Sequence, residues 1–417
     1  MAKIKKIIAR EILDSRGNPT IEAIIQLADS SVGIFSTPSG ISLSKFEAVE
    51  LRDTNLKRYR GMGVLTALEK IAKVVAPTLI GQEASNLYNI DNIIKKLDGT
   101  SNKSNIGANA TLAISGAIAK AQAISLKIPL YQYIAKLMGQ ITNQFSIPPP
   151  MFNIINGGMH ASFNLDFQEF LIVPPKANSY SKNLIMATEC YHTLAETLKA
   201  HNATTLVGDE GGFAPLLYSN MDALKIIEEA VTKAGYRVGL DIFFSLDVAA
   251  SHLVQGNSFR IKDKPVSLTA GDLIDFYIAI NEQYHLLSIE DPLPEDDWEG
   301  WQQVTEKLGG EMLIVGDDLI STNAQRLEKA IDLKAANSVV IKPNQIGTVT
   351  ETLDVVKIAK KANFKIIASH RSGETNDDFI ADFAVGIGAD YAKFGAPARG
   401  ERVAKYNRLL EIEHELS

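Results

Sequence analysis

The chain has 417 residues, 46% of them hydrophobic and 22% charged, so it is long enough to bury the core of a large globular protein. The formal net charge of −7 argues against a broad nucleic-acid surface, which needs clustered Lys and Arg. A single cysteine excludes an internal disulfide and fits a cytoplasmic location, and the lack of any run of about 18 apolar residues predicts no transmembrane helix.

The first part of the chain reads as strands followed by helices. The segments IKKIIAREIL and IEAIIQLA flank DSRGNPT, whose Gly-Asn-Pro is strong turn chemistry, so residues 1–28 are predicted to form a β-hairpin. The stretch STPSGISLSKFEA, residues 36–48, has too few apolar residues for a core and is expected to be a loop. Residues 64–81, 86–99 and 109–127 repeat apolar residues at i, i+3 and i+4, which predicts helices.

Three consecutive prolines, Pro148 to Pro150, interrupt both the helical and the strand patterns. In this region we place a boundary between an α+β N-terminal domain, residues 1–140, and a second domain, residues 141–417. The second domain alternates helical patterns with the apolar runs FFSLD, LLSIE, LIVGD, SVVIK, KIIASH and DYAKF. Such alternation predicts a parallel sheet, and the length is that of a (β/α)8 barrel.

The apolar runs of the second domain end on polar residues. In chain order these are Asp247, Glu290, Asp317, Lys342, His370 and Lys393. A single polar residue at a strand end is explained by capping of that strand. In a barrel, however, the C-terminal strand ends converge on the active site. Six polar residues at the same position of their strands therefore favour an active site over capping. Converging carboxylates without cysteine suit Mg²⁺.

Two lysines follow the acidic strand ends. A lysine near a cation and another lysine should have a lowered pKa, as a general base requires, and we expect this for Lys342. Pro343 is expected to keep Lys342 extended, because the residue before proline disfavours the α region. Upstream, NIINGGMHASFNLDFQEF carries His160 and Glu169, and LVGDEGGFAP carries Glu210. The acidic residues of LVGDEGGFAP could equally belong to a solvated turn. A carboxylic acid opposite a lysine base, however, is the arrangement that removes a proton on one side of a substrate and a hydroxide on the other.

The motifs, taken in order, resemble the enolase (phosphopyruvate hydratase) family from about residue 5 to the C-terminus. They are ILDSRGNPT, LDGTSNKSNIGANA, NIINGGMH, LDFQEF, VGDEGGFAP, SIEDPLPEDDWEGW, IVGDDLISTN, IKPNQIG, SHRSGET and KFGAPARGERVAKYN. The resemblance implies an α/β fold, with a TIM-like ββαα(βα)6 barrel and an α+β N-terminal capping domain. It further implies reversible dehydration of 2-phosphoglycerate to phosphoenolpyruvate, in glycolysis and gluconeogenesis.

The resemblance also assigns roles to individual residues. Lys342 is implied to be the base and Glu210 the general acid, with Glu169 beside it. Two Mg²⁺ ions are implied, the first bound by Asp247, Glu290 and Asp317, the second arriving with substrate and bound with help from Ser42. The residues implied to contact substrate are His160, Glu169, Glu290, Asp317, His370, Arg371, Ser372 and Lys393.

Several positions depart from the family pattern. The first mobile loop of the family reads like PSGASTG, whereas residues 38–44 read PSGISLS, with Leu43 and Ser44 in place of threonine and glycine. Other departures are Phe163, His252, Pro343 and Phe394. They leave the implied site residues in place and bear on loop closure and turnover. The resemblance also implies a homodimer or an octamer, and a secondary cell-surface or secreted pool.

Three functional hypotheses remain. The favoured one is an active glycolytic enolase. A second is another superfamily member, a dehydratase or ammonia lyase acting on a different carboxylate; the presence of Glu210, Lys342 and His160 together argues against it. The third is a divergent paralogue with low activity and a binding or moonlighting role, which would be expected to lose a metal ligand or the base first.

Overall fold

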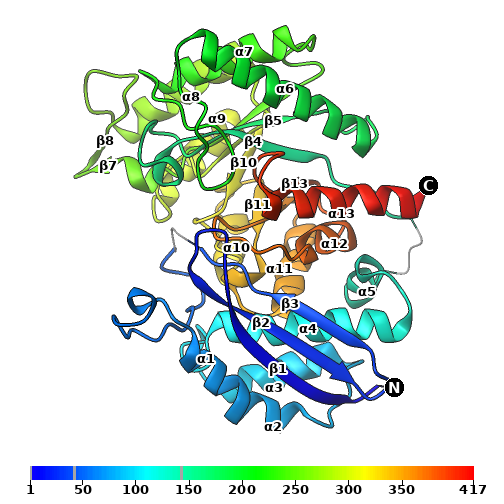
Figure 1. The fold of residues 1–417 in the computed structure, drawn as a ribbon. Helices are drawn as coiled ribbons and strands as arrows, with labels where there is room; N and C mark the ends of the chain where they lie inside the picture. Colours follow the sequence, from blue (N-terminus) through cyan, green and yellow to red (C-terminus); the bar gives the residue numbers. More distant parts are fainter. Residues whose placement is uncertain (1, 41–43, 141–143) are drawn as a thin grey trace.

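The computed structural model describes residues 2–40, 44–140 and 144–417. The chain begins with a three-stranded antiparallel sheet in the order β1-β2-β3, at the bottom of Figure 1. Its strands are β1 (Ile4–Leu13), β2 (Pro19–Leu27) and β3 (Val32–Ser36). The predicted hairpin is confirmed: Leu13 pairs with Pro19, and Gly17 takes a φ of +74° in the turn, where glycine carries little strain.

The predicted helices follow the sheet. They are α1 (Leu65–Lys70), continued by a π-helical turn (Ile71–Val75) and α2 (Ala76–Leu79), then α3 (Leu87–Asp98) and α4 (Ala108–Leu126). The break in the first helix precedes Pro77, which cannot donate a backbone hydrogen bond. A short 3-10 turn (Tyr59–Gly61) and α5 (Leu130–Leu137) complete this part.

Helix α4 is buried on nearly every side, between the sheet and the rest of the molecule. Its sequence is rich in Ala, Gly and Ser, which lets neighbouring elements approach closely. At Gly116 a Cβ would lie 2.7 Å from the ring of Phe35 on β3. A helix of larger side chains would not fit at this crossing.

Eight strands then close a barrel in the order β10-β11-β12-β13-β4-β5-β6-β9. They are β4 (Pro150–Asn156), β5 (Glu169–Val173), β6 (Phe243–Asp247), β9 (Ser288–Glu290), β10 (Leu313–Gly316), β11 (Ser338–Ile341), β12 (Lys365–Ser369) and β13 (Tyr391–Lys393). Strand β5 runs antiparallel to β4 and β6, and the other neighbours are parallel. Two strands therefore precede the first barrel helices, which confirms the ββαα(βα)6 order.

Helices surround the barrel. They are α6 (Tyr180–Ala200), α7 (Asn220–Lys233), α8 (Ala270–Tyr284), α9 (Trp298–Leu308), α10 (Ala324–Asp332), α11 (Val349–Lys361), α12 (Phe379–Gly386) and α13 (Gly400–Leu416). Short 3-10 turns (Gly158–Ala161, Ala250–Leu253, Pro343–Gln345) and a small hairpin of β7 (Val254–Gln255) and β8 (Ser258–Phe259) lie between them. Among the described residues, none of the helices has both the length and the apolar character needed to cross a bilayer.

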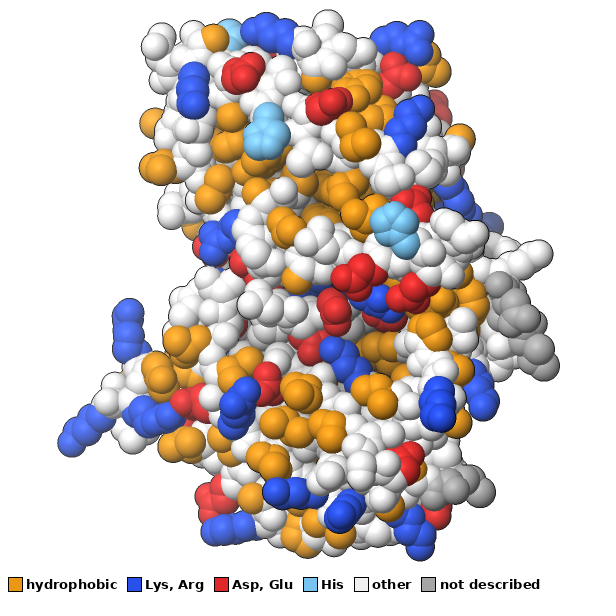
Figure 2. All heavy atoms as spheres, turned by 45° about the vertical axis from the view of Figure 1, so that its right-hand side comes forward, with side chains coloured by type: hydrophobic (Ala, Val, Ile, Leu, Met, Phe, Trp, Pro, Cys, Tyr) orange, Lys and Arg blue, Asp and Glu red, His pale blue; other side chains and the backbone are white. Residues whose placement is uncertain are grey.

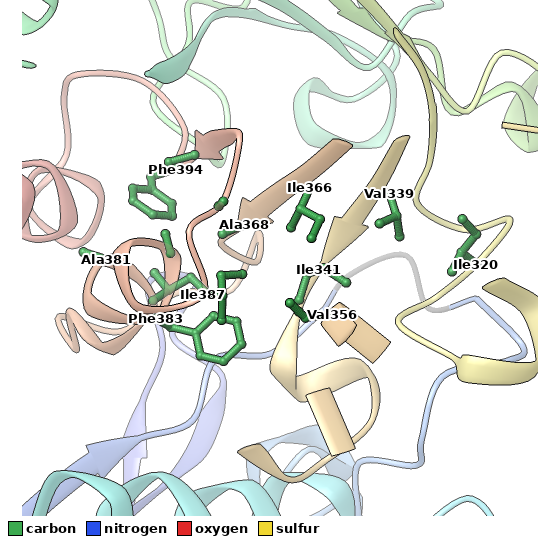
Figure 3. Packing of buried hydrophobic residues seen from close by; sticks show 14 of the residues in the cluster. Ile320, Val339, Ile341, Val356, Ile366, Ala368, Ala381, Phe383, Ile387 and Phe394 are labelled. Atoms are coloured by element: carbon green, nitrogen blue, oxygen red, sulfur yellow. The ribbon is translucent and has the colours of Figure 1, made fainter. Parts of the chain in front are cut away.

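Strand β11 shows how an apolar run serves two cores. Val339 and Ile341 belong to the large outer core, and Ile341 lies beside Val356 of α11 (Figure 3). Val340 points the other way, into the smaller cluster that fills the barrel. Because successive side chains alternate between faces and both faces are covered, the strand reads as continuously apolar.

The proline run behaves differently from expectation at one end. Pro150 is the first residue of β4, a position where the missing N–H is tolerated, so the run leads directly into a barrel strand. The predicted boundary between residues 140 and 141 adjoins residues 141–143, which lie outside the described part of the chain, and it stays a prediction.

On the face shown in Figure 2, acidic and basic side chains are interspersed and form no continuous basic patch.

Asp91 of α3 joins the N-terminal part to the barrel. Its Oδ2 accepts hydrogen bonds from the backbone N–H of Thr350 (3.1 Å), the Thr350 hydroxyl (2.8 Å) and the Ser115 hydroxyl (2.9 Å). Asp91 thus provides a hydrogen-bond acceptor for a backbone N–H group in the first turn of α11, which has no partner within the helix. Burial raises the pKa of Asp91 to about 6, although these hydrogen bonds oppose the shift.

We predict that Asp91→Asn changes how stability depends on pH. A carboxyl whose pKa is higher in the folded than in the unfolded chain destabilises the fold as it ionises, so the wild type loses stability from about pH 4 to about pH 7. Relative to the Asn variant the loss should be about 3 kcal/mol. Urea unfolding of both proteins across this range measures it, and a pH-independent difference between them would contradict it.

Candidate active site

The structure brings the predicted strand-end residues to one mouth of the barrel. Asp247, Glu290 and Lys393 are the last residues of β6, β9 and β13. The other three come directly after a strand: Asp317 after β10, Lys342 after β11 and His370 after β12. One cavity is lined by most of the predicted site: His160, Glu169, Glu210, Asp247, Asp317, Lys342, His370, Arg371, Ser372 and Lys393.

Lys393 lies at the centre of this cavity wall. Its Nζ is 2.8 Å from Glu290 Oε2, 3.1 Å from Asp247 Oδ2 and 3.1 Å from Glu169 Oε2. Its side chain is only 2% exposed. Burial by itself lowers the pKa of this ammonium, but the three carboxylates outweigh it and hold the pKa well above its usual value. Lys393 is therefore a fixed positive charge.

Lys342 is paired with one of the predicted metal ligands: its Nζ forms an ion pair with Asp317 Oδ2. Burial favours the neutral amine, yet the adjacent Asp317 outweighs it, so the protein's own groups raise the pKa of Lys342. The lowered pKa expected beside a divalent cation stays a prediction. The neighbouring cations Arg371 and Lys393 act in the expected direction but more weakly than Asp317. The backbone of Lys342 is extended, with φ −130° and ψ 106°, as predicted from Pro343.

Two carboxyls and a histidine form a second group in the cavity. Ligating atoms of His160, Glu169 and Glu210 lie within 4.8 Å of one another. Burial raises the pKa of Glu169 well above its usual value, with the charge of Glu210 adding to it. Burial also acts on Glu210, but the imidazoles of His160 and His370 outweigh it and lower its pKa. The pKa values of these two neighbouring carboxyls are therefore shifted in opposite directions.

Polar partners fix the orientation of this group. Asn153 Nδ2, from β4, donates to Glu210 Oε2 at 3.0 Å, and the Ser372 hydroxyl lies 3.1 Å from His160 Nε2. Arg402 Nη1 donates to His370 Nδ1 at 2.7 Å. Nδ1 of His370 is therefore an acceptor, which leaves its Nε2–H facing Glu210 Oε2 at 3.4 Å. Burial lowers the pKa of His370 to about 3, so the ring is neutral.

The acidic strand ends fit a hard divalent cation. Asp247 and Glu290 converge on one point, both within hydrogen-bond reach of Lys393 Nζ. The Oε1 atom of Glu290 is buried and has no hydrogen-bond partner among the described residues. The ligand atoms that Asp247, Glu290 and Asp317 offer are all carboxylate oxygens, the kind of ligand that Mg²⁺ prefers. Ser42, predicted to assist a second ion, lies outside the described residues.

Sequence reasoning did not identify several residues at the site. Asp291 and Asp318 each follow a predicted ligand directly, and with Asp317 they form a second acidic group within 4.8 Å. Asp291 accepts the backbone N–H groups of Asp317 (3.0 Å) and Asp318 (2.8 Å), which fixes the turn after β10. Adjacency to a strand-end acid was the available signal. For Asn153 and Arg402 no sequence signal existed, because their partners lie far away in the chain.

An eight-stranded barrel with buried lysines, paired carboxyls and a set of oxygen ligands at one mouth defines an enzyme that works by acid–base chemistry. Comparison with family models gives the particular family. Residues 144–417 match the "Enolase, C-terminal TIM barrel domain" and residues 4–134 match the "Enolase, N-terminal domain". Together these matches span nearly the whole chain, so the chain belongs to the enolase family and is a lyase of the phosphopyruvate hydratase type.

Phe163 is an unusual residue near the mouth. It follows the 3-10 turn that carries His160, has a φ of +59° and is 57% exposed. Ser162 beside it has a φ of +54°. Left-handed backbone at a large side chain is strained, whereas Asn adopts it readily.

We predict that Phe163→Asn stabilises the protein by about 1 kcal/mol, because it relieves this backbone strain. Chemical denaturation measures the change. The matched control is Leu216→Asn, which also removes an exposed apolar side chain (78% exposed) but at a position without positive φ. An equal gain in both variants would mean that surface polarity, not backbone strain, is responsible.

Proposed function

We propose that this lyase is a magnesium-dependent enolase of glycolysis and gluconeogenesis, which converts 2-phosphoglycerate reversibly to phosphoenolpyruvate and water. The observation that carries the proposal is that Lys342 and Glu210, the proposed base and acid, line one cavity. Lys342 follows β11, whereas Glu210 is held by Asn153 of β4. Strands β12 and β13 separate β11 from β4, so the two groups approach the cavity from different sides.

The chain's own residues account for the proton movements. Lys342 takes the proton from the carbon that bears the phosphate, and it does so as the free amine, which a divalent cation bound at Asp317 would favour over the ammonium. The bond from the next carbon to its hydroxyl then breaks, and the departing hydroxide takes a proton from Glu210, the general acid, with Glu169 beside it, and leaves as water. Lys393, fixed and positive, stabilises the negative charge that develops on the substrate carboxylate. Arg371, with its planar guanidinium, suits the phosphate.

Asp247, Glu290 and Asp317 are proposed to hold the first Mg²⁺, and Ser42 to contribute to a second that comes with substrate. Bound there, the ions would supply positive charge against the doubly charged enolate. The remaining predicted contacts, His160, His370 and Ser372, are proposed to line the substrate.

Assembly and location are proposed from the family. We infer a homodimer, or an octamer built from it, in the cytoplasm, with domains divided near residue 140. Exposed Ile8 on β1 and Ile34 on β3 both pair in register with Ile24 on β2 and so lie in line across one face of the sheet. With exposed Leu13 at the end of β1, they support burial of apolar sheet surface against a partner. The alternative, a divergent paralogue of low activity with a binding role, is supported by the strained Phe163 and by Ser44 in place of glycine. The turnover number distinguishes the two.

We predict that the purified protein forms phosphoenolpyruvate from 2-phosphoglycerate with Mg²⁺, followed by its ultraviolet absorbance. Lys342→Ala should lower kcat by about 10²- to 10⁴-fold, because it removes the base. Glu210→Gln should also abolish dehydration but retain exchange of the substrate's α-proton with deuterated solvent, since the base is intact. Loss of exchange in Glu210→Gln but not in Lys342→Ala would reverse the two roles. If the wild-type protein forms no phosphoenolpyruvate from 2-phosphoglycerate in the presence of Mg²⁺, the proposal is refuted.

Metal removal gives a separate prediction. Activity should vanish in EDTA and return on addition of Mg²⁺, because the cluster of buried carboxylates needs positive charge to bind an anionic substrate. Glu290→Gln should raise the Mg²⁺ concentration needed for half-maximal activity, since it removes a ligand charge. Full activity in EDTA would contradict the metal requirement without bearing on Lys342.

A further inference from the structure

A buried ion pair links Arg371 to the segment after the first loop. Glu47 Oε2 accepts Arg371 Nη1 at 2.8 Å, and Glu47 Oε1 accepts Nη2 at 3.1 Å. The two side chains are only 4% and 5% exposed. A two-point contact between planar groups fixes both the distance and the tilt of the guanidinium.

The pair leaves one edge of the guanidinium free. Asn344 Oδ1 accepts a further Nη1 hydrogen at 3.2 Å, so both Nη1 hydrogens and one Nη2 hydrogen are used. Within the described part of the chain, Nε and the second Nη2 hydrogen of Arg371 make no hydrogen bond. These two donors lie along one edge, which is the arrangement that receives two phosphate oxygens. Arg371 and Glu47 both line the cavity that holds the predicted site.

The same pair is tied to the base and to the acidic strand ends. Gln345 Nε2 donates to Asp317 Oδ1 at 3.1 Å and reaches Glu47 Oε1 at 3.5 Å. Gln345 Oε1 accepts the Thr322 hydroxyl at 2.6 Å, and that hydroxyl accepts the backbone N–H of Lys342 at 3.0 Å. The turn that follows the base thus carries the residues that contact Arg371 and Glu47. A shift of the Glu47 side chain would therefore move the Arg371 guanidinium, its closest partner.

We propose that Glu47 is a positioning residue for phosphate recognition: it holds the guanidinium of Arg371 so that its free edge faces the substrate phosphate. The proposal rests on the function proposed above, in that the phosphate is that of 2-phosphoglycerate. The carboxylates of Asp317 and Glu50 also attract Arg371, so without Glu47 the guanidinium would lose the two-point contact that fixes its tilt against that pull. Glu47 itself does not contact the reacting atoms.

The test uses Glu47→Gln, which keeps the shape of the side chain but removes its charge and one acceptor. We expect KM for 2-phosphoglycerate and the dissociation constant of inorganic phosphate, measured by calorimetry, to rise together by about 10- to 100-fold. The turnover number should change much less, because base and acid are untouched. Unchanged phosphate affinity, or a fall in turnover number at constant KM, would overturn the proposal.

A double-mutant cycle separates positioning from general structural support. Arg371→Gln should weaken phosphate binding, and Glu47→Gln combined with Arg371→Gln should weaken it no further, because Glu47 acts only through Arg371. The double variant should also be more stable than Arg371→Gln, which leaves a buried unpaired carboxylate. This keeps the test decisive even where a single variant folds poorly. An additional loss of affinity in the double variant, or wild-type affinity in Arg371→Gln, would overturn the proposal.

A matched control is Asp382→Asn. Asp382 also forms a two-point pair with an arginine, Arg408, at 2.7 and 3.0 Å, but it does not line the cavity. This variant should lose stability and leave phosphate affinity unchanged; weakened phosphate binding here would count against a specific role for Glu47. Phosphate calorimetry needs no turnover. If the wild type is inactive but its phosphate affinity still depends on Glu47, the proposed reaction is refuted and the positioning role is retained. If the wild type is active and Glu47→Gln leaves phosphate affinity unchanged, the positioning role is refuted and the proposed reaction is retained.

Discussion

The Lys393 ammonium, buried among three carboxylates at the mouth of the barrel, is the interaction on which the arrangement of the site depends. Ionised groups are expensive to bury unless they are paired and hydrogen-bonded. Closure of the barrel brings together the carboxylates at the start of β5 and at the ends of β6 and β9, and these would repel without a cation between them. Lys393 meets this requirement from within the chain. It leaves lone pairs such as that on Glu290 Oε1 for a further positive charge.

The register of the parallel strands made much of this site predictable. An apolar run covered on both faces ends where the barrel opens, so a charge at its last position must face the mouth, as Lys342 does after β11. The same rule located Asp247 and Glu290. Turn chemistry likewise located the first hairpin, since Gly17 needs only its neighbours to adopt positive φ.

What escaped prediction depends on contacts between distant segments. Glu47 lies in a polar stretch that predicted only a loop, yet it is buried because Arg371, 324 residues away, pairs with it. The sequence placed Lys342 among charged strand ends but did not show that the Asp317 side chain turns toward it, because strand spacing does not determine the orientation of a side chain. Residues such as Arg402 show the same limit: a helix surface pattern does not say which backbone oxygens it will meet.

The N-terminal part contributes to the site through the barrel's own backbone. The Thr111 hydroxyl on α4 donates to the carbonyl of Gly347 at 2.6 Å, and the Ser115 hydroxyl accepts the N–H of Val349 at 3.0 Å. These bonds hold the segment that joins Lys342 to α11 from the side away from the cavity. Ala48 donates to the carbonyl of Gln345 at 2.8 Å, in the same segment. The turn after the base is therefore fixed from both parts of the chain, so a barrel expressed without residues 1–140 would lose the support for Lys342 even if its strands closed.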